Sequence, residues 1–308
     1  SGAQYHLVDT PEKRAALIQT LASAPELCVD TETTDTDPMR ATLVGMSFAI
    51  SEGEAWYVPV GDDPCGVAGE FKAVLENPAT LKIGQNMKYD LQVLRSCGIR
   101  LAGPMFDTMI AHYLLHPEMR HGMDYLAEAY LNYQTIHIEE LIGTGKRQRS
   151  MADVPAQDVC PYAAEDADVT LRLRNVFAPQ LEAEGCTALF RDIEMPLMPV
   201  LAQMERNGVR IDTQGLEETS ALYTRQMQQM EQEIHEMAGM QFNVSSPRQV
   251  GEVLFDQLHL SSKAKKTKTG QYVTSEEVLE SLRPKHPIVG KILEYRGLKK
   301  LLSTYIDA

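Results

Sequence analysis

Apolar residues in the first part of the chain come in short runs that polar turns separate. Three runs lie at residues 27–30, 42–50 and 55–60, and the turn at 51–54 joins the last two. Runs of this length, bounded by glycine and acidic turn residues, are typical of strands. The spacing predicts an antiparallel hairpin and a further strand.

Strand-like and helical patterns alternate after this hairpin. The run at 81–84 is strand-like, and helical spacing follows at 87–96, 107–115 and 159–174. Helices that alternate with strands cover the faces of a sheet. We therefore expect residues 1–188 to form an α/β domain with a mixed sheet.

Strand patterns almost vanish beyond residue 194, and stripes of helical period replace them. The first stripe consists of Ile193, Leu197, Val200, Leu201 and Met204, and Asn207-Gly208 ends it. A second stripe follows an expected cap at Asp212 and repeats every seven residues at Leu216, Tyr223, Met230 and Met237. The third spans residues 288–305.

Two shorter helices are expected between the long ones. Ser246 and Thr274 each stand three residues before a Gln or Glu, which is the spacing of a capping box. Residues 189–308 are therefore expected to be all helical. Antiparallel pairing of the two long helices would bury both of their stripes.

Composition is that of a globular protein. The chain has 308 residues, of which 44% are apolar, enough for a substantial core and about two domains. Its longest apolar stretch, at 43–50, is far too short to span a bilayer, and no charged-then-apolar leader opens the chain. We expect a cytoplasmic monomer with no membrane partner.

The formal charge of −14 argues against indiscriminate binding along a phosphate backbone. Two stretches nevertheless carry only positive charge, residues 143–150 and 262–273. Each is either a solvated loop or a contact for nucleic acid.

The five cysteines are widely scattered and never form a C-x-x-C pair: Cys28, Cys65, Cys97, Cys160 and Cys186. Neither a disulfide framework nor a zinc site is expected from this spacing. We expect all five to be reduced thiols.

Acidic residues in three places are candidates for a metal site. Asp30 and Glu32 end a strand, so alternation aims both to one side of the sheet, where they can share a hard divalent cation. Tyr162 and Asp166 stand one helical turn apart on one face. Asp90 lies at the start of a helical segment. Taken singly, each has a plainer interpretation as a solvated surface group.

The order of these residues along the chain favours a metal site over solvated surface groups. Asp30, Glu32, Asp90, Tyr162 and Asp166 resemble the DEDD-plus-tyrosine signature of the proofreading exonuclease domain of family A DNA polymerases. The strings VDTETTDTD, LVGMSFAI, IGQNMKYD, FDTMIAHYLL, YAAEDADVTL and IEMPLMPVLAQMERNGVRID are similar as well. The resemblance runs from about residue 27 to the last residue. It implies a ribonuclease H-like fold followed by the start of a polymerase thumb.

The same resemblance implies the roles of the acidic residues. Asp30, Glu32, Asp90 and Asp166 would bind two divalent ions, Mg²⁺ or Mn²⁺, because an all-oxygen ligand set suits hard cations. Asp30 would contact both ions, Glu32 and Asp166 would complete the site of the water-activating ion, and Asp90 would support the second. Tyr162 would orient the attacking water. The implied reaction releases nucleoside 5′-monophosphates from DNA 3′ ends.

Substrate contacts are implied for Gln85, Asn86, Lys88 and Tyr89, which match the stretch that lines the single-strand site in the family. Two positions depart from the pattern, since Thr36 and Ile138 stand where relatives carry a leucine and a phenylalanine. Base stacking on an aromatic ring is worth about 1 to 3 kcal/mol. A weaker grip on the 3′ end is expected.

The helical part resembles a thumb, with residues 263–268 at its tip, and a thumb holds duplex DNA by its backbone. The chain ends before the palm carboxylates and the fingers helix, so we expect no primer extension from this polypeptide alone. Two other interpretations remain open. One is an inactive scaffold or DNA-binding module of such a polymerase, and the other is an RNA-trimming DEDD exoribonuclease.

Overall fold

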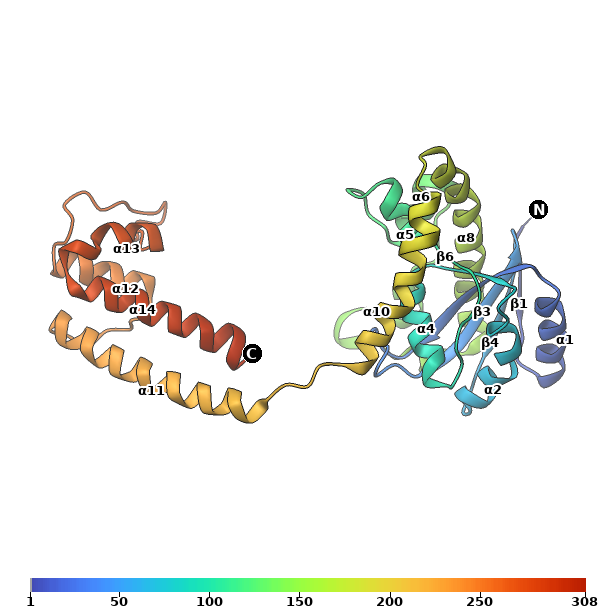
Figure 1. Cartoon of the computed structure of the whole chain (residues 1–308), viewed down its shortest axis with the longest axis horizontal. Coiled ribbons are helices and arrows are strands. Elements are labelled where there is room, and N and C mark those ends of the chain that lie inside the picture. The colour runs from blue at the N-terminus through green and yellow to red at the C-terminus, as the bar shows by residue number, and fades with distance from the viewer. Residues whose placement is uncertain (1) are drawn as a thin grey trace. The chain divides into compact units, whose positions relative to one another are not determined.

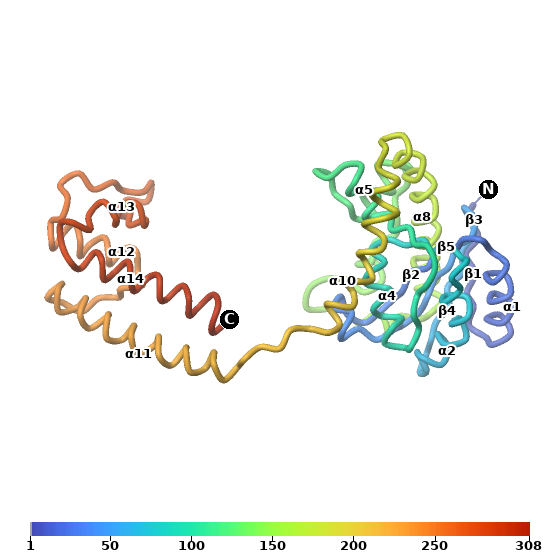
Figure 2. The backbone as a smooth tube through the Cα atoms, in the orientation of Figure 1, coloured from blue at the N-terminus to red at the C-terminus, as the bar shows by residue number. Residues whose placement is uncertain are grey.

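The structure is a computed structural model that describes residues 2–308. It consists of two compact units, Ser1–Gly208 and Val209–Ala308 (Figures 1 and 2). The first unit is built on a six-stranded sheet in the order β1-β4-β3-β2-β5-β6. Its strands are β1 (Gln4–Leu7), β2 (Glu26–Thr33), β3 (Leu43–Ser51), β4 (Glu54–Pro59), β5 (Leu81–Gly84) and β6 (Met105–Asp107). β3 pairs antiparallel with β2 and β4, and the other neighbours are parallel. The predicted α/β fold with a mixed sheet is confirmed.

Helices cover both faces of this sheet. The long helix α8 (Ala156–Ala183) packs against β1 to β5, and α5 (Thr108–Leu115) and α6 (Met123–Leu131) pack on α8. The opposite face is covered by α1 (Pro11–Ala22), α2 (Pro64–Glu70), α3 (Lys72–Leu75) and α4 (Met87–Ser96). Successive side chains of β2 point to opposite faces of the sheet, so Cys28 packs under α8 and Val29 packs against the helices on the other face. β2 is therefore held rigidly from both faces.

Short helices complete the first unit. They are α7 (Ile138–Ile142), η1 (Gly145–Arg147), η2 (Met151–Asp153), α9 (Thr187–Leu189) and η3 (Phe190–Glu194). α7, η1 and η2 connect α6 to α8, and η2 lies beside β2.

The last helix of this unit, α10 (Met195–Asn207), packs on α4. Met198 and Ala202 are buried in the core beneath it. The apolar stripe that predicted this helix lies on its other face, where Ile193, Leu197, Val200, Leu201 and Met204 are exposed. The two compact units divide between Gly208 and Val209. The change of pattern in the sequence suggests a boundary between residues 188 and 189.

All regular elements of the second unit are helices, apart from one isolated bridge in a loop. Its helices are α11 (Thr213–Ala238), α12 (Pro247–Gly251), η4 (Glu252–Gln257), α13 (Glu276–Leu282), η5 (Arg283–Lys285), α14 (Pro287–Leu301) and η6 (Leu302–Ile306). Lys291 pairs with Glu233 at 2.7 Å, and Ser220 donates to Asp307 at 2.7 Å. The contact partner of the earlier α11 residue, Ser220, lies later in the chain than the partner of Glu233. This order confirms the predicted antiparallel pairing.

The predicted caps of the helical part are correct in two cases of three. Asp212 accepts from Gly215 at the start of α11, and Ser246 accepts from Gln249 at the start of α12. The prediction for Thr274 is wrong, because α13 begins one residue later and its cap is Ser275. The oxygens of Thr274 instead accept hydrogen bonds from Arg296.

The expectation of five reduced thiols is wrong for one pair. Cys65 in α2 and Cys97 at the end of α4 form a disulfide, with a Cα–Cα distance of 4.7 Å. Cys28, Cys160 and Cys186 are free. The pairing depends on two helix ends that meet only in the folded chain, so the scattered spacing gave no sign of it.

No helix within residues 2–308 is both long enough and apolar enough to cross a membrane.

Thiol counting tests the disulfide. Alkylation of the denatured, unreduced protein should label the three free cysteines, and mass spectrometry should find an intact Cys65–Cys97 link. In the Cys97→Ala variant all four remaining cysteines of the original five should react, because Cys65 loses its partner. Labelling of five thiols in the unreduced wild-type protein contradicts the pairing.

Candidate active site

The end of β2 brings two acidic side chains to the α8 side of the sheet. Asp30 and Glu32 follow Cys28 at intervals of two residues, and Cys28 packs under α8. Glu32 is buried, whereas Asp30 keeps part of its surface exposed. The strand thus aims both carboxylates at the helix.

α8 supplies the groups that meet them. Tyr162 and Asp166 lie one turn apart on this helix, and Asp166 is buried. Asp30, Glu32 and Asp166 each offer a carboxylate oxygen, and these three atoms lie within 4.8 Å of one another. Strand alternation and helix spacing therefore converge on one cluster of three acids.

Asp90 reaches the same region from α4 but lies outside the group of three. Its Oδ1 accepts from the backbone nitrogen of Thr31 at 3.0 Å and from the Thr31 hydroxyl at 2.6 Å. Thr31 stands between Asp30 and Glu32 in β2. The buried Asp90 is therefore anchored to the strand beside the cluster, and the charge of Asp30 acts on it.

Burial and mutual repulsion dominate the electrostatics of these acids. Desolvation raises the pKa of Asp30 to about 7. Desolvation and then the charge of Asp30 raise the pKa of Glu32, Asp90 and Asp166 well above the usual carboxyl range. Like charges held together in a low-dielectric site disfavour ionisation of every member.

The cluster fits a hard divalent cation. Oε1 of the buried Glu32 has no hydrogen-bond partner in the described part of the chain. A buried carboxylate oxygen without a donor is costly unless something neutralises it. A cation with a preference for oxygen ligands, such as Mg²⁺ or Mn²⁺, would satisfy that oxygen and relieve the repulsion.

A cleft of about 700 Å³ opens over the cluster. Its lining comes from three sources: the end of β2 and the loop that follows it, the start of α4, and the α7–α8 region. The lining residues are Asp30, Thr31, Glu32, Thr33, Thr34, Asp35, Thr36, Asn86, Tyr89, Ile138, Ile142, Gln148, Arg149, Ser150, Met151, Tyr162 and Asp166. Thr36 and Ile138, the two departures from the family pattern, both face this cleft.

Only two of the four predicted substrate residues line the cleft, Asn86 and Tyr89. Gln85 is buried, and its amide donates to the carbonyl of His121 at 2.8 Å. Lys88 forms an ion pair with Glu205 of α10 at 2.5 Å. The structure therefore gives Gln85 and Lys88 partners within the protein.

The approach to α4 is conformationally unusual. Asn86 adopts a left-handed backbone with φ of 59°, which asparagine tolerates better than most residues. Asp107 holds this turn, because its carboxylate accepts from the backbone nitrogens of Asn86 at 3.3 Å and Met87 at 2.7 Å. The strained turn presents Asn86 to the cleft.

Sequence reasoning missed three residues that shape this site. Thr31 anchors Asp90, Asp107 holds the Asn86 turn, and Arg149 lines the cleft. Thr31 and Asp107 lie inside strings already identified, DTE and FDT, but their roles depend on partners distant in sequence. Arg149 lies in the positively charged stretch 143–150, which gave the only signal.

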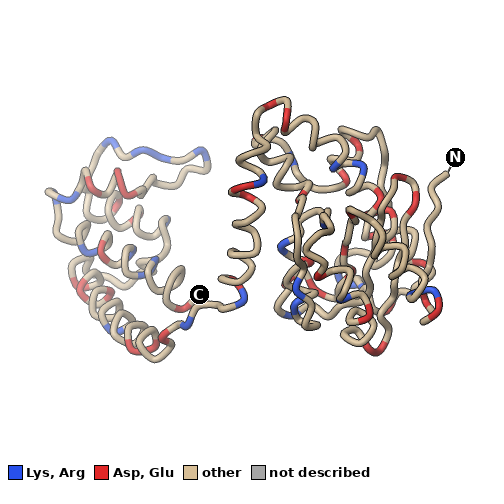
Figure 3. Tube along the Cα trace, turned by 45° about the vertical axis from the view of Figure 1, so that its right-hand side comes forward, with Lys and Arg blue, Asp and Glu red and all other residues tan. Residues whose placement is uncertain are grey.

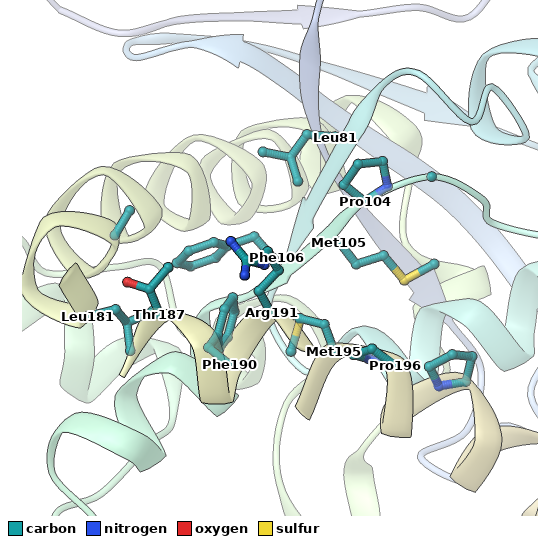
Figure 4. A pocket seen from close by; sticks show the side chains of 13 residues that line it. Leu81, Pro104, Met105, Phe106, Leu181, Thr187, Phe190, Arg191, Met195 and Pro196 are labelled. Carbon is teal, nitrogen blue, oxygen red and sulfur yellow. The ribbon is translucent and has the colours of Figure 1, made fainter. Parts of the chain in front are cut away.

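A second cavity of about 440 Å³ lies elsewhere in the first unit (Figure 4). Phe106, Leu181, Phe190 and Met195 form part of its largely apolar wall, with Arg191 and Thr187 beside them. None of the predicted site residues lines it, and it contains no carboxylate. The candidate chemistry belongs to the cleft at β2.

Comparisons with known proteins agree with this geometry. A family model described as 3′-5′ exonuclease matches residues 5–182, and one described as DNA polymerase family A matches residues 213–308. The chain is 42% identical to DNA polymerase I of Pseudomonas aeruginosa over 306 residues, which cover 95% of this chain and 33% of that protein. It is 40% identical to DNA polymerase I of Chloroflexus aurantiacus, over 96% of this chain and 32% of that protein.

The fold is also similar to a solved structure, the POL domain of Pol1 from M. smegmatis in complex with DNA primer-template and dNTP. The TM-score is 0.77 at 24% identity, and the match covers 98% of this chain and 49% of that chain. The chain spans about a third of the length of the curated relatives that it matches.

Metal binding and pH should be coupled in this site. Because the folded protein raises the pKa of Asp30 to about 7, the metal-free fold keeps a proton that the unfolded chain releases. That stabilisation is present at acidic pH and is lost as the pH rises through about 7. A divalent cation replaces the proton, so Mn²⁺ should raise the unfolding midpoint more at about pH 8 than at about pH 6.

Thermal unfolding measures the midpoint with Mn²⁺ and with chelator at each pH. Because both midpoints are taken at the same pH, their difference cancels the contribution of other titrating groups. The Asp166→Asn variant serves as the control and should lose most of the shift. An equal Mn²⁺ effect at both pH values, or a shift that the variant retains, is incompatible with cation binding by the cluster.

Proposed function

The chain belongs to the 3′–5′ exonuclease family and continues into a DNA polymerase family A segment, and from that membership we propose that its first unit removes nucleotides from the 3′ ends of DNA. The observation that carries the proposal is the convergence of Asp30, Glu32 and Asp166, with Tyr162, in one open cleft. The product is a nucleoside 5′-monophosphate, as proofreading requires.

The reaction is hydrolysis of the terminal phosphodiester. The oxygen of a water molecule attacks the phosphorus, the bond to the 3′ oxygen of the preceding nucleotide breaks, and the shortened strand gains a 3′ hydroxyl. One proton of the water passes to solvent, and the leaving 3′ oxygen takes up a proton from solvent to become that hydroxyl. Divalent ions, when bound, supply charge neutralisation at the phosphate, a lowered pKa for the water and stabilisation of the leaving oxygen.

The acids of the chain would hold those ions. We propose that Asp30, Glu32 and Asp166 would hold the ion that activates the water, and that Asp30 and Asp90 would hold the second ion. Two observations support the division: the three oxygens that approach one another, and the separate anchoring of Asp90 by Thr31. The hydroxyl of Thr31 fixes the orientation of the Asp90 carboxylate.

Tyr162 orients the water and does not act as a base. Burial, followed by the negative charges of Asp166, Glu32 and Asp30, raises the pKa of its phenol above the ordinary value. The phenol therefore keeps its proton at neutral pH. Its oxygen can accept a hydrogen bond from a water while its hydroxyl donates one.

The 3′-terminal nucleotide would lie between the Thr36 side of the cleft and the α7 side. Ile138, Ile142 and Met151 give the α7 side an apolar surface without an aromatic ring. Asn86 and Tyr89 line the floor near α4. Aliphatic contact in place of a stacked ring on the α7 side supports a weak, sequence-independent grip on the terminal base.

We further propose that the second unit binds duplex DNA by its backbone. The four lysines of residues 263–268 are exposed, and they give the loop before α13 a run of positive charge (Figure 3). The side chain of one of them, Lys266, lies 4.4 Å from the ring centroid of Tyr272. Exposed lysines suit phosphate contact without base readout. A monomeric state and a cytoplasmic location stay predictions.

Neither alternative gains support from a specific observation. An inactive scaffold would not need the buried, repelling carboxylates that this chain keeps. An RNA-trimming enzyme would not need the DNA polymerase family A segment. Parallel assays on matched DNA and RNA oligonucleotides separate the three possibilities.

The Asp166→Asn variant tests the mechanism. Nucleotide release from end-labelled single-stranded DNA should fall by at least about a thousandfold, because one anionic ligand of the metal site is lost. The same substitution removes a source of repulsion, so the metal-free variant should unfold about 2–4 °C higher than wild type at about pH 8. Gel analysis of the digest and thermal unfolding measure the two effects.

The matched control is Asp158→Asn, an exposed acid on the same helix, α8, that does not line the cleft. It should leave nucleotide release unchanged and should not raise the unfolding temperature, because a negative charge in the first turn of α8 stabilises the helix. Wild-type nucleotide release by the Asp166→Asn variant, or release that survives chelation of divalent ions, would falsify the proposed mechanism.

The Ile138→Phe variant tests the terminal-base site. A ring at this position can stack on the last base, and even the lower end of the stacking energy, about 1 kcal/mol, lowers KM for single-stranded DNA about fivefold. The control is Leu189→Phe, since Leu189 is 40% exposed, close to the 38% of Ile138, but lies outside the cleft. An unchanged KM for Ile138→Phe, or an equal change in both variants, argues against base contact at residue 138.

A further inference from the structure

The cleft is acidic, yet it must admit a polyanion. Asp30, Glu32, Asp35 and Asp166 contribute negative charge to its lining. Among the described residues that line it, Arg149 is the only lysine or arginine. Any direct attraction of a side-chain cation for the phosphates of a bound strand therefore comes from this one residue.

The chain fixes Arg149 at the cleft by an unusual set of contacts. Nε and Nη2 of its guanidinium donate to the carbonyl of Leu141 at 3.0 and 2.8 Å, and its backbone nitrogen donates to Ile142 at 2.9 Å. Gly143 and Gly145 have φ of 77° and 61°, which allow the intervening loop to fold back on α7. The end of α7 thus orients the guanidinium.

This arrangement leaves part of the guanidinium free. Arginine has five N–H donors in a planar fork. The Leu141 carbonyl engages Nε and Nη2, and Nη1 has no hydrogen-bond partner within residues 2–308. A fork that is held on one edge and open on the other is suited to a phosphate oxygen.

Other nearby cations lack this combination. Lys88 is paired with Glu205, and Lys146 and Arg147, on the same loop as Arg149, do not line the cleft. The positive stretch at 143–150 therefore presents one cation to the site and directs the others elsewhere.

We infer that Arg149 is a substrate-binding residue that holds a backbone phosphate of the single strand in the cleft. The inference rests on the proposed exonuclease function and adds a specific contact to it. The free edge of the guanidinium donates to a non-bridging phosphate oxygen, while the Leu141 carbonyl keeps the group in place. Arg149 acts in binding and takes no part in the chemical step.

The test compares Arg149→Gln, Arg149→Lys and the control Arg147→Gln in steady-state digestion of end-labelled oligothymidylate with Mg²⁺. Arg149→Gln and Arg147→Gln remove the same charge from the same loop, but only Arg149 lines the cleft. We expect Arg149→Gln to raise KM roughly tenfold with kcat within about twofold of wild type. Arg149→Lys keeps the charge and should recover much of the loss.

Salt dependence provides a readout that a purely structural role would not move. Loss of one phosphate contact on a single strand should reduce the slope of log(1/KM) against log salt by about 0.7, between about 50 and 200 mM KCl. Arg149→Gln should show this reduction, and Arg149→Lys and Arg147→Gln should keep nearly the wild-type slope. Thermal unfolding of each variant identifies damage to the loop.

Two results overturn the inference. One is a wild-type KM and slope for Arg149→Gln. The other is an equal loss in the Gln and Lys variants with an unchanged slope, which marks Arg149 as a brace for α7 only. If the wild-type protein itself shows no metal-dependent release of nucleotides, the proposed exonuclease function fails. That failure is seen in the wild-type protein alone and does not depend on the comparison of the Arg149 variants.

Discussion

The site depends on like charges that the fold forces together at the end of one buried strand. Burial and the charge of Asp30 raise the pKa of Glu32 and of Asp166, and Glu32 keeps an oxygen with no donor in the described part of the chain. Such an arrangement persists only if the surrounding structure over-determines it. β2 meets this demand because it lies inside the sheet, with α8 packed on one face and α4 on the other. The stability of the core is thus what holds repelling groups in place for a cation.

Neighbouring acids on α8 show how the fold separates structural from functional carboxylates. Asp168 is fully buried, and it accepts hydrogen bonds from Tyr5, Gly53 and Arg172. Glu165 accepts from Tyr133 at 2.5 Å and from the backbone of Ile136 at 2.6 Å. These two acids tie α8 to the sheet and to the loop before α7. Asp166, between them in sequence, faces the cleft and has no comparable set of donors, which leaves it available to a metal ion.

The cations around the site are divided in the same way. Lys88 is the natural candidate for a phosphate contact by sequence, but Glu205 of α10 pairs with it, and Gln92 joins the same carboxylate at 2.7 Å. This polar clamp holds α10 on α4 and extends the first compact unit to Gly208. Arg149 instead is oriented by a backbone carbonyl, which neutralises none of its charge. Pairing partners, and not the presence of a positive residue, determine which cation a bound strand can meet.

The sequence by itself determined the features that depend on short-range periodicity. Alternation in β2 aims Asp30 and Glu32 to one side, helical spacing puts Tyr162 and Asp166 on one face, and heptad spacing predicts the paired helices of the second unit. Only the tertiary structure decided which buried acid is left without donors, that Lys88 is neutralised, where the compact units divide, and that Cys65 meets Cys97. The physical reason is that each of these outcomes depends on a partner far away along the chain. Local patterns fix the direction of a side chain, but its charge state and availability are set by what the fold brings next to it.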